Sequence, residues 1–333
     1  MAGRTITIIG SLNTDLVTHT PRVPEGGETL TATSFSTGGG GKGANQAVAC
    51  VRLSRARGSP SSDIAVKMVG GVGADEFGPP HIEAMKRDGI DTSGIRVVEG
   101  ETTGVAVILV ESGSGENRIL FSPGANYSLQ PADFATAESL GSPKPDLIIM
   151  QLEIPLGTVL QILKTAKQAG VDVLLNPAPA VKLPEEAYGA ITHLILNETE
   201  AAILSGRSVE EVEEEGFGWE SLAAEFLKKG VRNVVVTLGA KGAYYATEGR
   251  GGYVEAGKVE KVVDTTAAGD TFVGAYAVSI VRKGGHEPID DETVKFACRA
   301  AGRTVERRGA QSAIPWADEV ASRASRATGI FHE

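Results

Sequence analysis

The chain has little cysteine, and the cysteine it has is not arranged as a structural or metal site. Of its 333 residues only Cys50 and Cys298 are cysteines, and they stand far apart, outside any Cys-x-x-Cys spacing. This arrangement indicates neither a disulfide framework nor a zinc site. We therefore expect both thiols to be buried as small apolar groups.

The chain also has no dense block of lysine and arginine and no long apolar run. Its formal net charge is −10, which opposes a phosphate-seeking surface, so we expect no nucleic-acid partner. The opening letters MAGRTITIIGSLN show neither a charged region followed by an apolar stretch nor a membrane span. We expect a cytoplasmic protein with no membrane partner, which in a eukaryotic source also enters the nucleus.

Short β-branched runs alternate with helical patterns along most of the chain. Continuous apolar runs are typical of strands buried on both faces, and the segment PLGTVLQILKTAKQAG, residues 155–170, places its apolar residues on one helical face. The pattern predicts an α/β fold with a mostly parallel sheet and helices on both faces, in one domain over 1–333. The expected strands are residues 5–10, 64–71, 146–151, 172–177, 193–197 and 233–239.

Four further segments depart from this alternation. Residues 14–37 and 95–126 show short alternating strands with turn signals and no helical period, so we expect one small antiparallel sheet that forms a lid. Residues 55–63 are rich in serine, glycine and proline, and residues 208–219 are strongly acidic. We expect these two to loop out or to extend a helix into solvent, without a catalytic role.

The stretch STGGGGKGAN, residues 36–45, superficially matches a phosphate-binding P-loop. The P-loop pattern G-x-x-x-x-G-K-[ST] needs a first glycine and a final hydroxyl. Here Ser36 stands at the first glycine position, and Lys42 is followed by Gly43. The sequence therefore predicts another use for this lysine.

A second chemical signal is VVDTTAAGDTFVGAYAVSIV, residues 262–281. Ala267, Ala268 and Gly269 precede a helical pattern that begins near Asp270, so backbone N–H groups should converge there on an anion. Asp270 is consistent with a helix cap as well as with chemistry. The three small residues, which let a ligand approach the backbone, favour chemistry.

The two glycine-rich stretches, GGGGKGANQAVA and DTTAAGDTFVGA, resemble the two signatures of the PfkB carbohydrate kinases. Further matches cover nearly the whole length: GSLNTDLV, TTGVAVILV, GAN, MQLEIP, NPAPA, NETEA, TLGAKG and RRGAQSAIPW. The resemblance implies a Rossmann-like domain with a β-sheet lid, often paired in a homodimer. It also implies transfer of the γ-phosphate of ATP to a sugar hydroxyl. The particular residues of the weaker motif matches resemble those of kinases that act on the 5-hydroxyl of D-ribose, which gives D-ribose 5-phosphate and ADP.

The resemblance assigns roles to particular residues. Asp270 would be the general base, and the amides of Ala268 and Gly269 would form the anion hole. The sugar would be bound by Asn13, Asp15, Gly40, Gly41, Lys42, Asn45, Glu153 and Asp270. A general base and an anion hole suit phosphoryl transfer, where positioning and charge stabilisation supply most of the catalysis.

The nucleotide and metal sites follow from the same resemblance. The ATP site would comprise Asn197, Thr237, Leu238, Gly239, Ala240, Lys241, Gly242, Gly269 and Cys298. Glu200 would hold Mg²⁺ through water, although Asn197 and Glu200 also match a helix capping box. A potassium site would comprise Asp264, Thr266, Thr304, Arg307, Gly309 and Ala313. Two departures weaken specific contacts: Cys298 stands where relatives carry histidine or asparagine, and Ala313 stands where they carry serine.

Three other functions remain open at this stage. The first strand is followed by GSLNTD rather than G-x-G-x-x-G, which disfavours a dinucleotide-dependent oxidoreductase. The acceptor could instead be fructose, deoxyribose, a 2-keto-sugar acid or a nucleoside, and Thr103, Val105 and Ala106 of the lid would decide it. A non-catalytic sugar sensor is the third option, and it has no need of a base such as Asp270 beside an anion hole.

Overall fold

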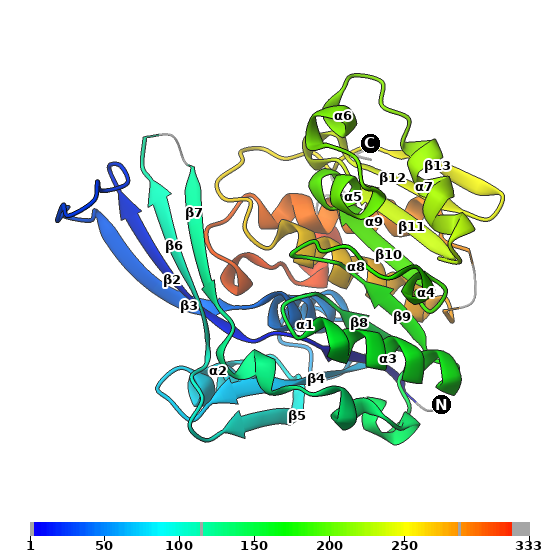
Figure 1. Cartoon of the computed structure of the whole chain (residues 1–333), viewed down its shortest axis with the longest axis horizontal. Helices are drawn as coiled ribbons and strands as arrows, with labels where there is room; N and C mark the ends of the chain where they lie inside the picture. The colour runs from blue at the N-terminus through cyan, green and yellow to red at the C-terminus, as the bar shows by residue number, and fades with distance from the viewer. Residues whose placement is uncertain (1–2, 114–115, 286–287, 322–333) are drawn as a thin grey trace, which may run out of the picture.

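The computed structural model describes residues 3–113, 116–285 and 288–321, and its strands form two sheets of unequal size (Figure 1). The large sheet consists of β13 (Arg250–Val254), β12 (Ala243–Thr247), β11 (Asn233–Thr237), β10 (His193–Asn197), β9 (Asp172–Leu175), β8 (Leu147–Met150), β1 (Arg4–Ile9), β4 (Ile64–Gly73) and β5 (Asp91–Val98), in that order. All pairings from β11 to β5 are parallel. The strand β12 pairs antiparallel with both of its neighbours, β11 and β13. The prediction of a mostly parallel sheet is confirmed.

Helices cover both faces of the large sheet. They are α1 (Lys42–Leu53), α2 (Gly78–Arg87), α3 (Leu156–Ala169), α4 (Glu185–Tyr188), α5 (Glu198–Ser205), α6 (Val209–Glu213), α7 (Trp219–Lys228), α8 (Ala268–Arg282) and α9 (Asp291–Thr304). Short 3₁₀ turns are η1 (Gly124–Ser128), η2 (Pro131–Phe134), η3 (Ala137–Leu140), η4 (Gly239–Lys241) and η5 (Gln311–Ala313).

The core divides into two layers because neighbouring strand residues point to opposite faces. In β10, Ile195 packs with α1, α8 and α9, whereas Leu194 and Leu196 pack with α3, α5 and α7. Both faces are therefore apolar, as the continuous runs predicted. Helix α3 ends at Gly170, whose left-handed φ of 61° closes it.

The small sheet stands out from one side of the body, at the left in Figure 1. Its order is β3 (Ser34–Gly40), β2 (Asn13–Thr20), β6 (Gly104–Glu111) and β7 (Asn117–Ser122). The two outer pairings are antiparallel, as expected, but β2 and β6 are parallel. Both of these strands run outward from the large sheet, and β3 and β7 return. Residues 95–98, expected in the lid, instead complete β5 beside β4.

The remaining segments lie at the surface or in the core as expected, although Trp219 at the end of the acidic segment is buried. Residues 55–63 form a loop between α1 and β4. The acidic segment 208–219 folds into α6 and the start of α7, and its Trp219 is buried against Phe217. Cys50 and Cys298 are both buried. Within the described ranges, no helix has the length and hydropathy to span a bilayer.

Candidate active site

Most of the predicted site residues lie where the parallel strands end. Asn13 begins β2, four residues after the end of β1, Glu153 follows β8, Asn197 ends β10 and Thr237 ends β11. The strands β11, β10, β9, β8 and β1 are neighbours in the sheet, so their carboxyl ends form one continuous edge. In open α/β sheets ligands bind at this edge. Helices α1 and α8 begin there too and bring Lys42, Asn45 and Asp270.

Glu153 is the centre of a hydrogen-bond cluster at this edge. Its Oε2 accepts from Ser11 Oγ at 2.5 Å, from the Lys42 amide at 3.0 Å and from Asn13 Nδ2 at 3.3 Å. Asn126 Nδ2 in turn donates to Asn13 Oδ1 at 2.7 Å. The amide of Asn13 is thereby oriented, because its oxygen accepts on one side and its nitrogen donates on the other.

Asp15 is a buried carboxyl group close to this cluster, with 9% of its surface exposed. Burial, followed by the charges of Glu153 and Asp270, raises the pKa of Asp15 to about 7, and Lys42 opposes the rise. A ligand hydroxyl that donates a hydrogen bond to the ionised carboxylate would favour this charged form.

The glycines Gly40 and Gly41 have a packing role that the sequence did not indicate. A Cβ on Gly40 would lie 2.2 Å from Asp15 Oδ1. Gly41 has φ +85°, and its Cβ would lie 2.6 Å from the backbone nitrogen of Asn13. These glycines therefore let the turn between β3 and α1 approach the polar groups that follow β1.

Asp270 lies in the first turn of α8, buried, with 7% of its surface exposed. Its Oδ2 accepts from Asn45 Nδ2 and its Oδ1 from Gln46 Nε2, both at 2.9 Å. The preceding Ala267 has a left-handed φ of 59°, a conformation that costs energy for a residue with a Cβ. Strain and two dedicated donors favour a functional carboxylate over a simple cap.

The amides at the start of α8 are only partly as expected. The Ala268 amide already donates to the Thr265 carbonyl at 3.3 Å. In the part of the chain that the structure describes, the amides of Gly269 and Asp270 have no backbone acceptor. The groups free to bind an anion are thus shifted one residue along the helix from the predicted pair.

A cavity of about 210 Å³ adjoins Asp270 and the start of α8. Its polar lining comprises Lys42, Asn176, Asn197, Glu200, Thr237, Thr265 and Asp270. Burial lowers the pKa of Lys42, but the charges of Asp270, Glu153, Glu200 and Asp15 together outweigh it and raise that pKa. Lys42, predicted on the sugar side, thus holds Glu153 by its amide and extends its charged side chain into this cavity.

Asn197 and Glu200 form the capping box that the spacing allowed as an alternative. The Glu200 amide donates to Asn197 Oδ1 at 2.7 Å, and the Asn197 amide donates to Glu200 Oε2 at 2.9 Å. Both side chains also line the cavity. Burial is the main cause that raises the pKa of Glu200, with Asp270 adding to it, against the Asn197 amide and Lys42.

The predicted nucleotide loop is partly open to solvent. Gly239, Ala240 and Lys241 form the exposed turn η4. Leu238 is buried, and Gly242 has φ +101°.

Cys298, which was predicted to contact the nucleotide, lies in apolar surroundings. It belongs to the core layer of α1, α8 and α9, and burial raises its pKa to about 11. Its thiol is therefore protonated at neutral pH, and its environment is apolar.

Three of the predicted potassium residues, Asp264, Thr266 and Gly309, are joined by hydrogen bonds just before the start of α8. Asp264 Oδ1 accepts from the Thr266 amide and hydroxyl, and its Oδ2 accepts from the Gly309 amide at 2.9 Å. Burial alone would raise the pKa of Asp264, but these hydrogen bonds hold it below the ordinary value of 3.8. Thr304 and Ala313 are fully buried nearby in sequence to Arg307. The set offers an ionised carboxylate and backbone oxygens, a donor set that suits a hard cation.

Sequence reasoning missed several polar residues that support the site. They are Ser11, Gln46, Asn126, Gln151 and Asn176, all buried. Gln46 directly follows Asn45 in the glycine-rich stretch and Ser11 directly precedes Leu12 and Asn13, so adjacency to a motif was the available signal. Their partners lie more than 30 residues away or on other strands, and spacing alone does not reveal them.

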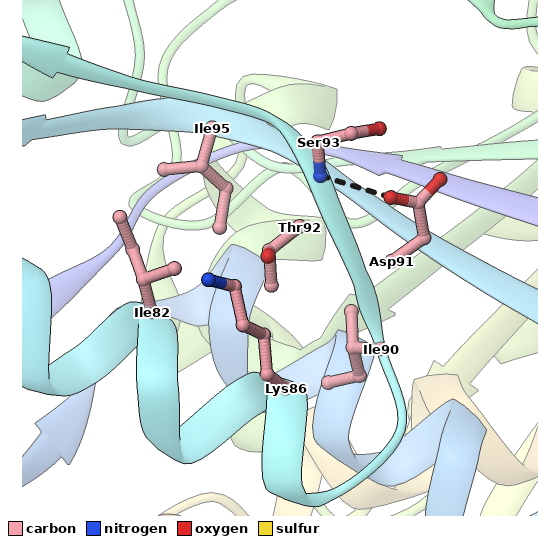
Figure 2. Close-up of a pocket in the computed structure, with 7 residues that line it drawn as sticks. All are labelled: Ile82, Lys86, Ile90, Asp91, Thr92, Ser93 and Ile95. Carbon is pink, nitrogen blue, oxygen red and sulfur yellow. Dashed lines mark hydrogen bonds between the residues drawn. The ribbon is translucent and has the colours of Figure 1, made fainter.

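A second hollow, of about 540 Å³, lies between α2 and the edge strand β5 (Figure 2). Its lining includes Ile82, Ile90 and Ile95 together with Lys86, which pairs with Glu83 at 2.6 Å. It contains none of the predicted site residues, so the chemistry belongs to the smaller cavity beside Asp270.

A buried carboxyl group, Asp270, lies at a helix terminus with free amides and near a cluster of polar side chains around Glu153. This arrangement is that of a phosphotransferase whose acceptor carries hydroxyl groups. The chain belongs to the pfkB family of carbohydrate kinases, whose family model matches residues 4–317.

Individual relatives cover nearly the whole chain. It is 45% identical to a ribokinase of Schizosaccharomyces pombe, over 93% of this chain and 94% of the relative. It is 38% identical to a deoxyribokinase of Salmonella typhi, over 93% and 95% respectively. An Arabidopsis thaliana ribokinase solved with ribose and ATP superposes with a TM-score of 0.81 at 31% identity, covering 97% of this chain and 98% of that one.

Proposed function

We propose that this protein transfers the γ-phosphate of ATP to the 5-hydroxyl of D-ribose, forming D-ribose 5-phosphate and ADP. The observation that carries the proposal is Asp270, a buried carboxylate held by two amides at the free N-terminus of α8. The similarity to ribokinases supports ribose as the acceptor.

The acceptor is bound on the side of Asp15 and Glu153. The carboxylates of Asp15, which is buried, and of Glu153, which is partly buried, accept hydrogen bonds from sugar hydroxyls, and the amide of Asn13 is oriented by Glu153 and Asn126. A site of this kind rejects a sugar that lacks a hydroxyl, because each buried group left unpaired costs about 1–3 kcal/mol.

Asp270 takes the proton of the attacking hydroxyl. Its two oxygens already accept one amide hydrogen bond each, and a carboxylate has about four lone-pair sites, so room remains for the proton. The amides of Gly269 and Asp270 and the ammonium group of Lys42 stabilise charge on the transferring phosphoryl group.

Magnesium and potassium are further parts of the proposal. Glu200, with Asn197 beside it, lines the cavity and offers an oxygen ligand for Mg²⁺ or its water; bound Mg²⁺ neutralises charge on the phosphates. The ionised Asp264 with the carbonyls of Thr266, Thr304, Arg307, Gly309 and Ala313 would hold K⁺. Among the described residues, no group of three or more histidine, cysteine or acidic side chains is arranged to hold a metal ion by itself.

A homodimer through the small sheet is also proposed. Its edge strands β3 and β7 expose large apolar side chains: Phe35 is 63% exposed, Ile119 56% and Leu120 70%. Phe35 and Leu120 lie on one face of this sheet and Ile119 on the other, and exposed apolar side chains of this size mark interaction surfaces. Light scattering on the wild type and on Leu120→Glu tests it: a dimer that dissociates in the variant supports the proposal, and a monomeric wild type contradicts it.

The deoxyribokinase relative makes 2-deoxy-D-ribose the acceptor to compare with ribose. The test is ADP release from Mg²⁺-ATP with D-ribose, 2-deoxyribose, fructose and adenosine, each assayed in potassium and in sodium buffer. We expect ribose to give the highest kcat/KM by orders of magnitude. A higher kcat/KM for another acceptor would support the phosphotransfer reaction but identify that acceptor as the substrate. No turnover with any of them would favour a sugar sensor.

A further inference from the structure

Gln46 is a fully buried amide that donates to Asp270, and the function proposed above gives it no role in catalysis beyond that contact. It lies in α1, with none of its surface exposed, directly after Asn45. Its Nε2 donates to Asp270 Oδ1 at 2.9 Å and to Asn176 Oδ1 at 3.1 Å. Its Oε1 accepts from Gln151 Nε2 at 2.6 Å.

The orientation of the Gln46 amide is determined by its neighbours. Asn176 Nδ2 donates to the backbone carbonyl of Ile195 at 3.0 Å, and a backbone carbonyl has no alternative orientation. Asn176 therefore presents its oxygen to Gln46. A reversed Gln46 would aim its own oxygen at that oxygen and at the Asp270 carboxylate, two repulsive contacts in a buried site.

Gln151 completes the hydrogen bonds of Gln46 from the opposite side. It lies just after β8, two residues before Glu153, and is fully buried. Its Nε2 donates to Gln46 Oε1, so the end of β8 carries both the sugar-binding carboxylate and the donor to the oxygen of Gln46. The result is a chain of amides from the strand ends to Asp270.

We propose that Gln46 is a positioning residue that holds the carboxylate of Asp270 in the plane required for proton transfer, that Asn176 fixes its orientation, and that Gln151 satisfies its oxygen. The proposal rests on the proposed function of Asp270 as the base. Asn45 holds Oδ2 and Gln46 holds Oδ1, so the carboxylate cannot rotate without breaking a charge-assisted hydrogen bond. General-base catalysis depends on such geometry.

Two substitutions at position 46 separate positioning from packing. Gln46→Leu removes the donor and keeps the bulk, whereas Gln46→Glu keeps the shape and puts a carboxyl group against Asp270. Two carboxyl groups in contact either repel or share a proton, and both outcomes impair the base. A residue that only fills space would tolerate leucine with kcat unchanged, because leucine keeps the bulk and buries no charge.

The measurements are kcat, the KM for ribose and ATP, and the thermal unfolding midpoint of the full chain. We expect Gln46→Leu to lower kcat by about 10–100-fold with both KM values within about threefold, and Gln46→Glu to lower kcat further. The control is Gln161→Leu, which removes an amide bonded to Thr165 in α3 and should keep wild-type kinetics. A kcat within twofold of wild type for Gln46→Leu, or a milder loss for Gln46→Glu, overturns the proposal.

A third variant keeps the test decisive if position 46 does not tolerate change. Gln151→Leu leaves Gln46 in place and removes the donor to its buried oxygen, which loosens the Gln46 amide, so we expect kcat to fall about 3–10-fold at unchanged KM. Wild-type kcat in Gln151→Leu overturns the role of this amide chain in positioning Asp270. A wild-type enzyme that phosphorylates another acceptor is tested with that acceptor, and one without any kinase activity overturns the proposed function and this inference together.

Discussion

Asp15→Asn should stabilise the free protein at alkaline pH while weakening its hold on ribose. Asp15 is buried, and its pKa of about 7 exceeds the ordinary value of 3.8 by about three units. Each unit corresponds to 1.36 kcal/mol, so ionised Asp15 costs at most about 4 kcal/mol of folding free energy. Asparagine has no charge to bury, but it leaves Lys42 with one carboxylate fewer, so we expect a net gain of about 1–2 kcal/mol.

The sign of this effect depends on pH. Because the pKa of Asp15 is higher in the folded state, the native protein holds more protons than the unfolded chain between about pH 4 and pH 7. Wild-type stability therefore falls as pH rises through that window. The charged groups that face Asp15 are Glu153, Asp270 and Lys42. The stability gap between variant and wild type should be full above pH 7 and should narrow towards pH 4.

Ribose binding should follow the opposite course, because the sugar hydroxyls need the ionised carboxylate. We expect the wild-type KM for ribose to rise up to about tenfold from pH 8 to pH 6, where most of Asp15 is protonated. In Asp15→Asn this dependence should be lost, and KM should be raised about 10–100-fold, since hydrogen bonds to a charged group contribute about 1.5–3 kcal/mol.

The assay pairs thermal unfolding without ligand at pH 8 and pH 5 with ribose kinetics at pH 8 and pH 6. A midpoint raised by about 2–3 °C at pH 8, with a smaller gap at pH 5, agrees with the reasoning. A variant less stable than wild type at pH 8, together with a wild-type KM that does not change with pH, would refute it.

Three further predictions concern the glycine turn and the two cations. Gly40→Ala places a Cβ 2.2 Å from Asp15 Oδ1, so the KM for ribose should rise at least about tenfold with the KM for ATP unchanged; equal effects on both would contradict this local role. Glu200→Gln keeps the capping box with Asn197 but removes the charge, so the Mg²⁺ concentration for half-maximal rate should rise about tenfold at unchanged stability, and an unchanged Mg²⁺ curve rules out the ligand role. Potassium should raise kcat several-fold over sodium, and Asp264→Asn should abolish the difference; identical rates for wild type in both salts sink the potassium site.

Six strands of the large sheet, β1, β4, β8, β9, β10 and β11, could be predicted because they are largely buried on both faces, whereas β5, β12 and β13 were not predicted as its strands. Apolar runs such as 193–197 announce such strands in the sequence itself, and their ends locate residues such as Asn197. The edge strand β13 was missed because its residues RGGYV are mostly exposed and rich in glycine. The parallel pairing of β2 with β6 joins segments some 90 residues apart, and no local pattern reports it.

The site could be predicted in part, because some of its residues stand in recognisable motifs. Asp270 and Lys42, which line the cavity, stand in such motifs at the starts of α8 and α1. Ser11 and Glu153 are 142 residues apart, and Gln46 and Asp270 are 224 apart. Such buried polar contacts depend on how the elements pack, so they emerge only from the folded structure. The shift of the free amides from Ala268 to Asp270 likewise depends on the Thr265 turn.

The central claim is that Asp270 is the base for phosphorylation of ribose, and the ribose-dependent turnover of Asp270→Asn tests it most directly. Asparagine keeps the size of the side chain and removes the proton acceptor. The account predicts a kcat at least about 100-fold below wild type, with ribose and ATP dissociation constants within about tenfold. A kcat close to wild type would contradict the account.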